Sequence, residues 1–366
     1  YAYVAGHLYR YGTNTTPGTT DMSAAFASAA LVSATHPMIL PQENMRLNTG
    51  FALPTNGSIV GGDKWTSRIL WYGTGVAIRS VGTVNVGGAN RIKLKDFAVV
   101  CSNTGNDGLA LLYGGQNYLQ RVRFVSDGTN RFRICLITDQ TILTVSDGCD
   151  YEGFTLAGIL GPYNGEYTTY GTTVTSYVTT LVVKGWGQVN NLYPGSIGIA
   201  FDRGESLIVK ETNFNAVSFP VRVSKACTTV DVHNNYYERV EADYDSSTNR
   251  GPALLIAGTS TLSAAAVTAL STGVVSFRSN HIDFRQRGAP DNDGVVEINN
   301  GYDGTINVTE NEFQQGFSHC VLVSGGTVKR LRFHGNERLT ADEAMMDDGF
   351  KRSVFIAPGA TITQLH

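Results

Sequence analysis

Residues 230–237 read VDVHNNYY and residues 275–282 read VSFRSNHI, so two apolar positions, an Asn and a further apolar position recur at one spacing. Three further stretches repeat this spacing: 306–313 (INVTENEF), 331–338 (LRFHGNER, with Arg338 last) and 207–214 (LIVKETNF, with Thr212 in the Asn position). A solenoid needs the same few residues to recur once per turn of the chain. The pattern therefore predicts stacked coils of similar structure.

The ladder positions, which are residues 212, 235, 280, 311 and 336, lie 23, 45, 31 and 25 residues apart. One coil of a parallel β-helix has about this length. Because parallel strands stack about 4.8 Å apart, equivalent side chains lie directly over one another. We expect the apolar positions to fill the core and each Asn to hydrogen-bond the Asn above and below it. Asn also tolerates the left-handed backbone that a bend of this kind often needs.

We interpret the longest step, of 45 residues, as one coil with two insertions around an apolar strand at 253–256. Looser repeats without Asn, at 92–99 and 181–186, extend the coils toward the N-terminus. The composition agrees, because it is rich in Gly, Val, Thr, Ser and Asn, as in turn-rich all-β proteins. The sequence predicts an all-β chain in which residues 51–366 form a right-handed, single-stranded parallel β-helix.

The first fifty residues differ from these repeats. Apolar residues at helical spacing predict a helix over about 21–34, which Thr20 or Asp21 can cap at its N-terminus. Residues 38–41 then read as an entry strand that ends in Pro. Because the open end of a solenoid needs a cover, we expect residues 1–50 to form an N-terminal cap with this helix.

The N-terminal run from Arg10–Gly12 through Asp21–Phe26 to Ile39–Pro41 resembles the start of the pectate-lyase-like β-helix domain of bacteriophage tailspikes. Members of that family have an aromatic-Gly segment, a Thr-Asp-x-x-Ala-Ala helix and an apolar strand that ends in Pro. Here Asn14–Pro17 replaces the more common Gly-Asp-Gly turn. Together with the ladder coils, the resemblance covers nearly the whole chain.

The resemblance implies a homotrimer that is part of a virion tail, or a secreted protein if the source is bacterial. It implies a receptor-binding depolymerase that hydrolyses a bacterial surface polysaccharide (capsule, exopolysaccharide or O-antigen) with a carboxylate pair. A lyase that acts on a uronate-containing polymer and a non-catalytic polysaccharide-binding adhesin stay open, because one fold hosts many activities. The chain begins at Tyr1 and not at Met, so we expect a fragment that lacks flanking virion-binding or trimerisation domains.

Composition argues against several other functions. The formal net charge is −3 and charged residues make up 16% of the chain, so the polycationic surface that grips nucleic acid is not expected. No apolar run approaches the roughly 18 residues of a membrane span. The five cysteines are far apart and form no C-x-x-C pair, so we expect buried thiols and neither a metal site nor a cofactor.

Catalytic candidates must come from side chains on the outer wall of the coils. Strand alternation points Asp202, Arg222 and Glu297 outward, and further acids follow Glu238 in an excursion before the strand at 253–256. The predicted catalytic candidates are Asp202, Glu205, Glu241, Asp243 and Glu297, with Arg203 and Arg222 as substrate-binding residues. For each acid the alternative is a solvated surface carboxylate or an ion pair, for example between Asp202 and Arg203.

The coil step limits which acids can act together. Retaining glycosidases need carboxyl groups about 5 Å apart and inverting ones about 6.5–9.5 Å. Asp202 and Glu297 are three coils apart in the expected register, or about 14 Å, so they are not a pair. Asp202 with Glu205, or with the acids of 241–245, satisfies the limit.

A second kind of candidate is the Gly-rich stretch 161–170, which reads GPYNGEYTTY. Its three tyrosines, Tyr163, Tyr167 and Tyr170, are predicted to stack on sugar rings and to leave their hydroxyl groups free for hydrogen bonds. Packing of this segment on the wall or on a neighbouring subunit is the alternative. His281 flanks a ladder residue, so we expect it to make hydrogen bonds within the turn.

Overall fold

A computed structural model describes residues 3–81, 91–162, 178–191, 193–240, 251–259, 261, 273–285, 294–313, 319–338 and 354–366. In these residues one α-helix, one short 3-10 helix and thirty strands are present, and strands of successive coils pair in parallel. The predicted all-β class and right-handed parallel β-helix are confirmed. The chain divides into two compact units, Tyr1–Gln188 and Val189–His366, and each is described by itself.

The first unit holds the N-terminal helices and the strands of the first coils. Its elements are η1 (Leu8–Arg10), α1 (Ser23–Val32), β1 (Met38–Ile39), β2 (Asn44–Leu47), β3 (Phe51–Leu53), β4 (Ser58–Val60), β5 (Arg68–Trp71), β6 (Val76–Ser80), β7 (Lys93–Cys101), β8 (Asp107–Ser126), β9 (Phe132–Asp147), β10 (Asp150–Glu152), β11 (Phe154–Gly161) and β12 (Val178–Lys184). The short strand β13 (Gln188–Asn190) contains the boundary between the units.

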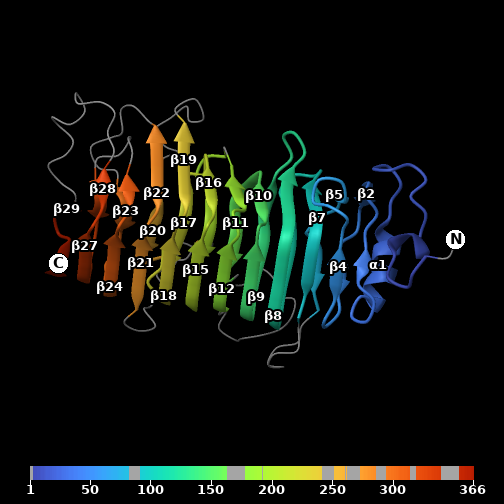
Figure 1. Cartoon of the computed structure of the whole chain (residues 1–366), viewed down its shortest axis with the longest axis horizontal. Coiled ribbons are helices and arrows are strands. Elements are labelled where there is room, and N and C mark those ends of the chain that lie inside the picture. The colour runs from blue at the N-terminus through green and yellow to red at the C-terminus, as the bar shows by residue number, and fades with distance from the viewer. Residues whose placement is uncertain are drawn as a thin grey trace. The chain divides into compact units, whose positions relative to one another are not determined.

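Helix α1 covers the first coils, as the sequence predicts (Figure 1). Its Phe26 is fully buried, and the ring stacks on that of Phe51 with centroids 5.2 Å apart. The capping differs from the expectation, because the N-cap residue is Met22 and its side chain makes no capping bond. Asp21 lies one residue earlier, and its Oδ1 accepts a hydrogen bond from the backbone N–H of Ser23 at 3.0 Å.

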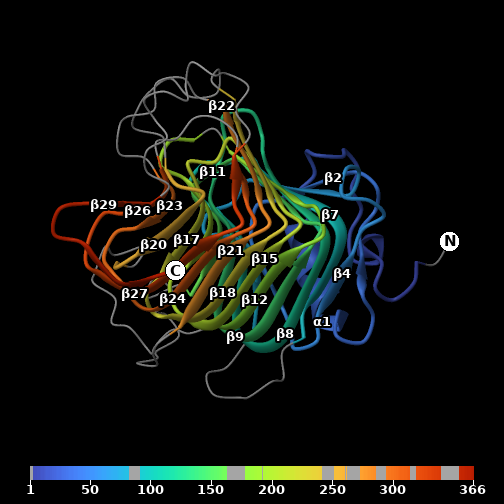
Figure 2. The same cartoon turned by 60° about the vertical axis from the view of Figure 1, so that its left-hand side comes forward.

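The second unit consists of coils with three strands each, except that the last coil has two strands in the described part of the chain. Its strands are β14 (Ile197–Phe201), β15 (Gly204–Lys210), β16 (Asn213–Asn215), β17 (Phe219–Ser224), β18 (Cys227–His233), β19 (Tyr236–Val240), β20 (Leu254–Ala257), β21 (Val274–Arg278), β22 (His281–Arg285), β23 (Gly294–Ile298), β24 (Tyr302–Thr309), β25 (Glu312–Phe313), β26 (His319–Val323), β27 (Thr327–His334), β28 (Glu337–Arg338), β29 (Val354–Ile356) and β30 (Thr361–Leu365). Each strand pairs in parallel with the strand three places later in the chain, for example β14 with β17. Each full coil therefore adds one strand to each of three parallel sheets, and the stacked strands can be followed in both views (Figure 1, Figure 2).

The Asn positions of the second unit form the expected ladder. Asn280 Nδ2 donates to Asn311 Oδ1 at 3.0 Å, and Asn280 Oδ1 accepts from Asn235 Nδ2, also at 3.0 Å. The same amide donates to the carbonyl of Val232 on β18 at 3.0 Å, so all three bonds of the side chain join neighbouring coils. These residues are at most 2% exposed, and the ladder therefore satisfies buried backbone groups that would otherwise lack partners.

The left-handed backbone lies one residue earlier than we expect from the sequence. Asn234, Ser279 and Glu310, each directly before a ladder Asn, have φ angles of 55°, 52° and 57°. The ladder residues Asn280 and Asn311 do not have positive φ angles. The expectation that the ladder Asn itself adopts this conformation is wrong, and the residue before it carries the strain.

The 45-residue step between Asn235 and Asn280 is one coil, as predicted. Strand β18 pairs directly with β21, and Val230 lies opposite Val275. Val230 is fully buried, and burial of such a side chain contributes about 1.5–3 kcal/mol to folding. All five cysteines are free and buried, which confirms that expectation.

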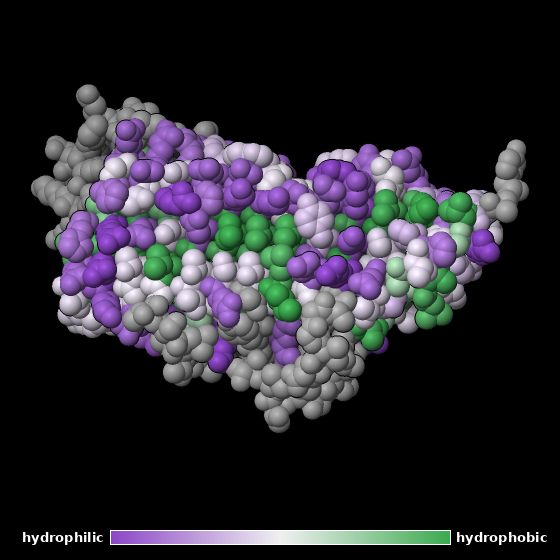
Figure 3. Space-filling view, turned by 60° about the horizontal axis from the view of Figure 1, so that its bottom comes forward, coloured by the Kyte–Doolittle hydropathy of each residue, from purple (hydrophilic) through white to green (hydrophobic). Residues whose placement is uncertain are grey.

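The outer surface is mixed in polarity. Both units expose some large apolar side chains, among them Trp65 (57% exposed), Trp186 (64%) and Leu365 (55%). On the face drawn in Figure 3, hydrophobic residues lie among hydrophilic ones. In the described part of the chain, no helix has the length and the apolar character that crossing a membrane would require.

Candidate functional site

The structure brings together two of the residues that the sequence singles out, Asp202 and Arg222. Asp202 follows β14, and its Oδ1 accepts a hydrogen bond from Nη1 of Arg222 at 2.7 Å. Both side chains are 9% exposed, although strand alternation predicts that they point outward. Thr261 Oγ1 also donates to Asp202 at 2.7 Å, and Arg222 Nη2 donates to the carbonyl of Thr259 at 2.7 Å. The pair therefore anchors the chain that follows β20.

The other predicted residues of the described chain lie apart from this pair. Glu205 is exposed on β15, the next strand, and Arg203 is half-buried in the turn before it. Glu297 is half-buried on β23, where its Oε1 accepts a hydrogen bond from Ser324 Oγ at 2.8 Å. Its register partner on β20 is Leu255, which in turn pairs with Arg222. Glu297 is thus three coils from β14, the separation expected from the ladder.

Five predicted site residues fall outside the described residues. These are the acids Glu241 and Asp243 and the tyrosines Tyr163, Tyr167 and Tyr170.

Two acidic residues that the sequence does not predict as a pair lie in register on neighbouring strands of the second unit. Strands β19 and β22 run in parallel with Glu238 directly opposite Asp283, so their Cα atoms are about 4.8 Å apart. Glu238 is half-buried, and Asp283 is 1% exposed. Like charges directly opposite each other destabilise a sheet. Local violations of this kind are expected at functional sites, where they are compensated elsewhere in the fold.

Further polar and aromatic side chains share this face of the sheet, two residues earlier on each strand. The ring of Tyr236 stacks on that of His281, with centroids 5.0 Å apart and an angle of 14° between the planes. His281 Nδ1 lies 2.7 Å from Oε2 of Glu312 on the next coil. We call Glu238, Asp283, Tyr236, His281 and Glu312 the acid cluster. His281 therefore contacts other coils, whereas the sequence suggests only bonds within its turn.

A signal for this cluster is present in the sequence. Glu238 and Asp283 each stand three positions after a ladder residue, Asn235 and Asn280. Aligning the repeats on these asparagines places the acids one above the other. The interpretation of Glu238 as the start of an excursion concealed the pair, because β19 continues to Val240.

The arrangement suits acid–base chemistry by carboxyl groups. Within the described residues, no group of three or more His, Cys, Asp or Glu side chains is placed to hold a metal ion. The backbones of the two acids are one strand spacing apart, about 4.8 Å between Cα atoms, so their carboxyl groups can reach the 5–5.5 Å separation found in retaining glycosidases. Tyr236 and His281 add flat rings and hydrogen-bonding groups beside the acids.

No protein-family model matches the sequence, and no curated protein matches it at a significant level. Solved structures are similar over nearly the whole chain. DFA-IIIase from Arthrobacter chlorophenolicus A6, without its lid and in complex with GF2, has a TM-score of 0.63 at 13% identity, covering 98% of this chain and 93% of that chain. The catalytic unit of the GH87 α-1,3-glucanase from Streptomyces thermodiastaticus strain HF3-3 has a TM-score of 0.52 at 13% identity, covering 100% and 69%. At this identity the likeness shows the fold, a parallel β-helix, and the tailspike resemblance stays a prediction.

Proposed function

We propose that this chain is a polysaccharide depolymerase that binds and hydrolyses a bacterial surface polysaccharide, with Glu238 and Asp283 as its carboxylate pair. The observation that carries the proposal is their position directly opposite each other on β19 and β22. The similar fold of an α-1,3-glucanase supports a carbohydrate substrate. The substrate class, namely capsule, exopolysaccharide or O-antigen, rests on the tailspike resemblance of the N-terminal segment.

The position of the pair on neighbouring strands suits a retaining mechanism, whose two carboxyl groups are about 5–5.5 Å apart. In this proposal Asp283 is the nucleophile, because its side chain is the shorter and the more restricted of the two. Its carboxylate attacks the anomeric carbon and displaces the leaving sugar, which gives a covalent glycosyl-enzyme. Glu238 is longer and more exposed, so it protonates the leaving glycosidic oxygen and then deprotonates the water that releases the product.

The rest of the acid cluster positions the sugar. Tyr236 and His281 are stacked in parallel, so their edges present hydroxyl and imidazole groups beside the acids. Oε2 of Glu312 lies 2.7 Å from Nδ1 of His281, and this contact fixes the orientation of the imidazole ring. A sugar ring beside Glu238 can then hydrogen-bond groups that are already in place, which lowers the entropic cost of binding.

The biological setting is part of the proposal. A receptor-binding, tailspike-like role implies a homotrimer on a virion tail, or a secreted protein if the source is bacterial. The net charge of −3 supports a partner other than nucleic acid. Sedimentation equilibrium of the purified chain tests the trimer, and a monomer over the micromolar range would contradict it.

One experiment separates the three candidate functions. The purified chain is incubated with a panel of bacterial capsules, exopolysaccharides and O-antigens, and product size, new reducing ends and ultraviolet absorbance are recorded. Hydrolysis shortens a polymer and creates one reducing end per cut without an absorbing double bond. A lyase would create that double bond, and an adhesin would bind the polymer and leave it intact, so either result would contradict the proposal.

A further inference from the structure

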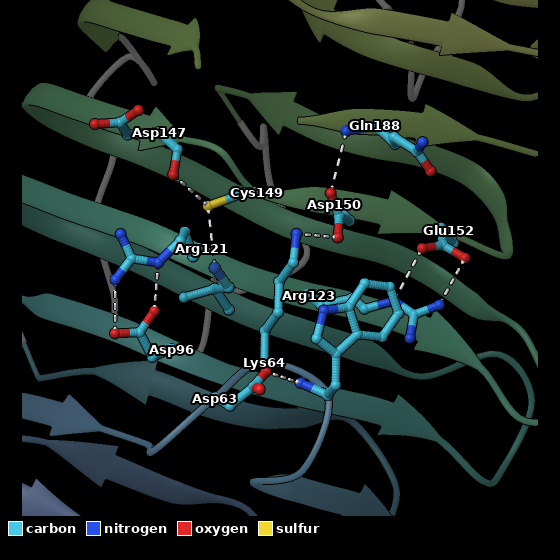
Figure 4. A network of polar contacts seen from close by, with 12 residues as sticks. Asp63, Lys64, Asp96, Arg121, Arg123, Asp147, Cys149, Asp150, Glu152 and Gln188 are labelled. Carbon is cyan, nitrogen blue, oxygen red and sulfur yellow. Dashed lines mark hydrogen bonds and ion pairs between the residues drawn. The ribbon is translucent and has the colours of Figure 1, made fainter. Parts of the chain in front are cut away.

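In the first unit, a short segment before β5 lies over the outer face of a sheet (Figure 4). The sheet places Arg68, Ala98, Arg123 and Asp150 in one row across β5, β7, β8 and β10. Lys64 Nζ lies 2.7 Å from Asp150 Oδ2, three strands from β5, or about 14 Å across the sheet. The segment is therefore fastened at its far end by an ion pair.

Trp65, the next residue, is held on this surface but remains exposed. The guanidinium of Arg123 lies over its ring, with Cζ 4.2 Å from the ring centroid, and Lys64 Nζ lies 5.5 Å from it. Arg123 is itself held by Glu152, because Nε of Arg123 donates to Oε1 of Glu152 at 2.9 Å and Nη2 of Arg123 donates to Oε2 at 3.1 Å. The ring is thus held by cation–π contacts with Arg123 and Lys64, while 57% of the residue is open to water.

A fixed, exposed ring bordered by charges suits a ligand with one apolar face and a polar edge. A pyranose has this form, because its axial C–H groups make an apolar face and its hydroxyl groups point outward. The C–H face covers the indole of Trp65, and hydroxyl groups bond the charged side chains at its border. Lys64 and Arg123 are balanced by Asp150 and Glu152, so a neutral sugar fits better than a uronate or a phosphate.

We propose that Trp65, Lys64, Arg123 and Glu152 form a sugar-binding subsite that holds a neutral pyranose of the polymer without cleaving it. The identity of the ligand as a polysaccharide rests on the proposed function. Binding without cleavage follows from the engagement of the carboxylates, since Asp150 is paired with Lys64 and Glu152 with both donors of Arg123. Pre-ordering of the ring lowers the entropic cost of binding.

The test compares Trp65→Ala with Trp186→Ala, a matched control that removes another exposed tryptophan of the same unit. Both changes are made in the full chain carrying Glu238→Gln, so that polymers stay intact. Affinity electrophoresis is run in gels that contain each polymer of the panel, with dextran as a neutral probe and alginate as a polyuronate probe. On a neutral polymer that retains the parent chain, Trp65→Ala should raise the Kd about tenfold, and Trp186→Ala should leave it unchanged.

The outcomes separate this proposal from the proposed function. Equal affinities of the two tryptophan variants, retention on alginate alone, or retention on no polymer would overturn the subsite. Trp65-dependent binding of a polymer that the unaltered chain leaves whole would support the subsite and contradict only the hydrolytic activity. Hydrolysis of a polymer whose binding does not depend on Trp65 would support the hydrolytic activity and contradict only the subsite.

Discussion

Asp202 and Arg222 form an ion pair with a 2.7 Å hydrogen bond, and both side chains are more than nine-tenths shielded from water. Two coils contribute the charges, and Thr261 supplies a further donor. A shielded charge that loses its partner destabilises a protein by about 3–5 kcal/mol. This relationship makes the acid a structural element of the second unit.

Removal of either charge should therefore reduce stability more than catalysis. We expect Asp202→Ala to lower the free energy of unfolding by about 3–5 kcal/mol, because it leaves Arg222 buried without its counter-ion. Urea denaturation measures this loss, and turnover per folded molecule measures activity. Glu205→Ala, an exposed acid on the next strand, is the control and should change stability by less than about 0.5 kcal/mol. A fully stable Asp202→Asn chain without activity would instead make this carboxylate catalytic.

Loss of the proposed catalytic pair should have the opposite signature. Glu238→Gln removes one of two like charges in register, so it should raise the free energy of unfolding by about 0.5–1 kcal/mol. Turnover should fall at least about 100-fold, because the general acid is lost. Glu310→Gln, an exposed acid of the same unit, is the control for both measurements.

Azide distinguishes the two roles within the pair. The small anion should restore turnover to the Asp283→Ala chain as an external nucleophile and yield a glycosyl azide detectable by mass spectrometry. Unchanged turnover in both Glu238→Gln and Asp283→Asn would contradict the assignment of these residues.

The amide ladder should be sensitive to single truncations. Asn280→Ala removes the acceptor of Asn235 Nδ2 and two donated bonds, to Val232 and Asn311. Each buried group left without a partner costs about 1–3 kcal/mol, so we expect a loss of several kcal/mol in urea denaturation. The control is Asn307→Ala, whose amide makes one bond to Ser276 on the outer surface. Equal effects of the two substitutions would contradict a stabilising ladder.

Substitution by glycine should affect the free energy of unfolding less at Glu211, the residue before the ladder position Thr212, than at the neighbouring Lys210. Glu211 has a φ of 51°, which costs a residue with a side chain about 1–2 kcal/mol. Relief of this strain offsets the added entropy of the unfolded chain in Glu211→Gly. Lys210→Gly, one residue earlier in β15, has no such relief. The free energy of unfolding should differ between these variants by at least about 1 kcal/mol, with Glu211→Gly the more stable.

Stability should decline at alkaline pH because of the buried thiols. Burial raises the pKa of Cys149 to about 11 and that of Cys227 to about 12, whereas a thiol in an unfolded chain titrates near 8.5. The buried neutral thiols therefore contribute fully to the free energy of unfolding below about pH 8.5, and this contribution is lost as the pH rises toward 11–12. Between pH 8 and 10.5 each thiol should account for a loss of about 2 kcal/mol in urea denaturation. Cys149→Ala should show a shallower pH slope, and an unchanged slope would contradict the assignment.

The coils could be predicted because the residues that align them recur in the sequence. Each ladder residue, such as Asn280, bonds its equivalents in neighbouring coils, so the requirement repeats with every turn. Helix α1 likewise has local signals in residues 21–34. The position of the left-handed residue could not be predicted, because Asn234 directly precedes Asn235 and either residue tolerates that conformation.

The site was harder to predict because its residues are brought together over long distances in the chain. The burial of Asp202 depends on Thr261, 59 residues later, and no local pattern records such a contact. Strand alternation alone therefore pointed this acid toward solvent. The pair of Glu238 and Asp283 was accessible to prediction, because the ladder aligns them, but it required β19 to be extended past the turn.

The pairing of β18 with β21 is in register although 45 residues separate Asn235 from Asn280. The next pairing, of β21 with β24, is equally regular across 31 residues. The register between stacked strands therefore does not depend on the length of the segment that connects them. A scaffold with this property can inherit its frame unchanged while the segment between β19 and β20 is exchanged, lengthened or replaced by foreign peptides. Recognition and folding can then diversify separately, and a library of grafted segments would sample new specificities on one stable frame.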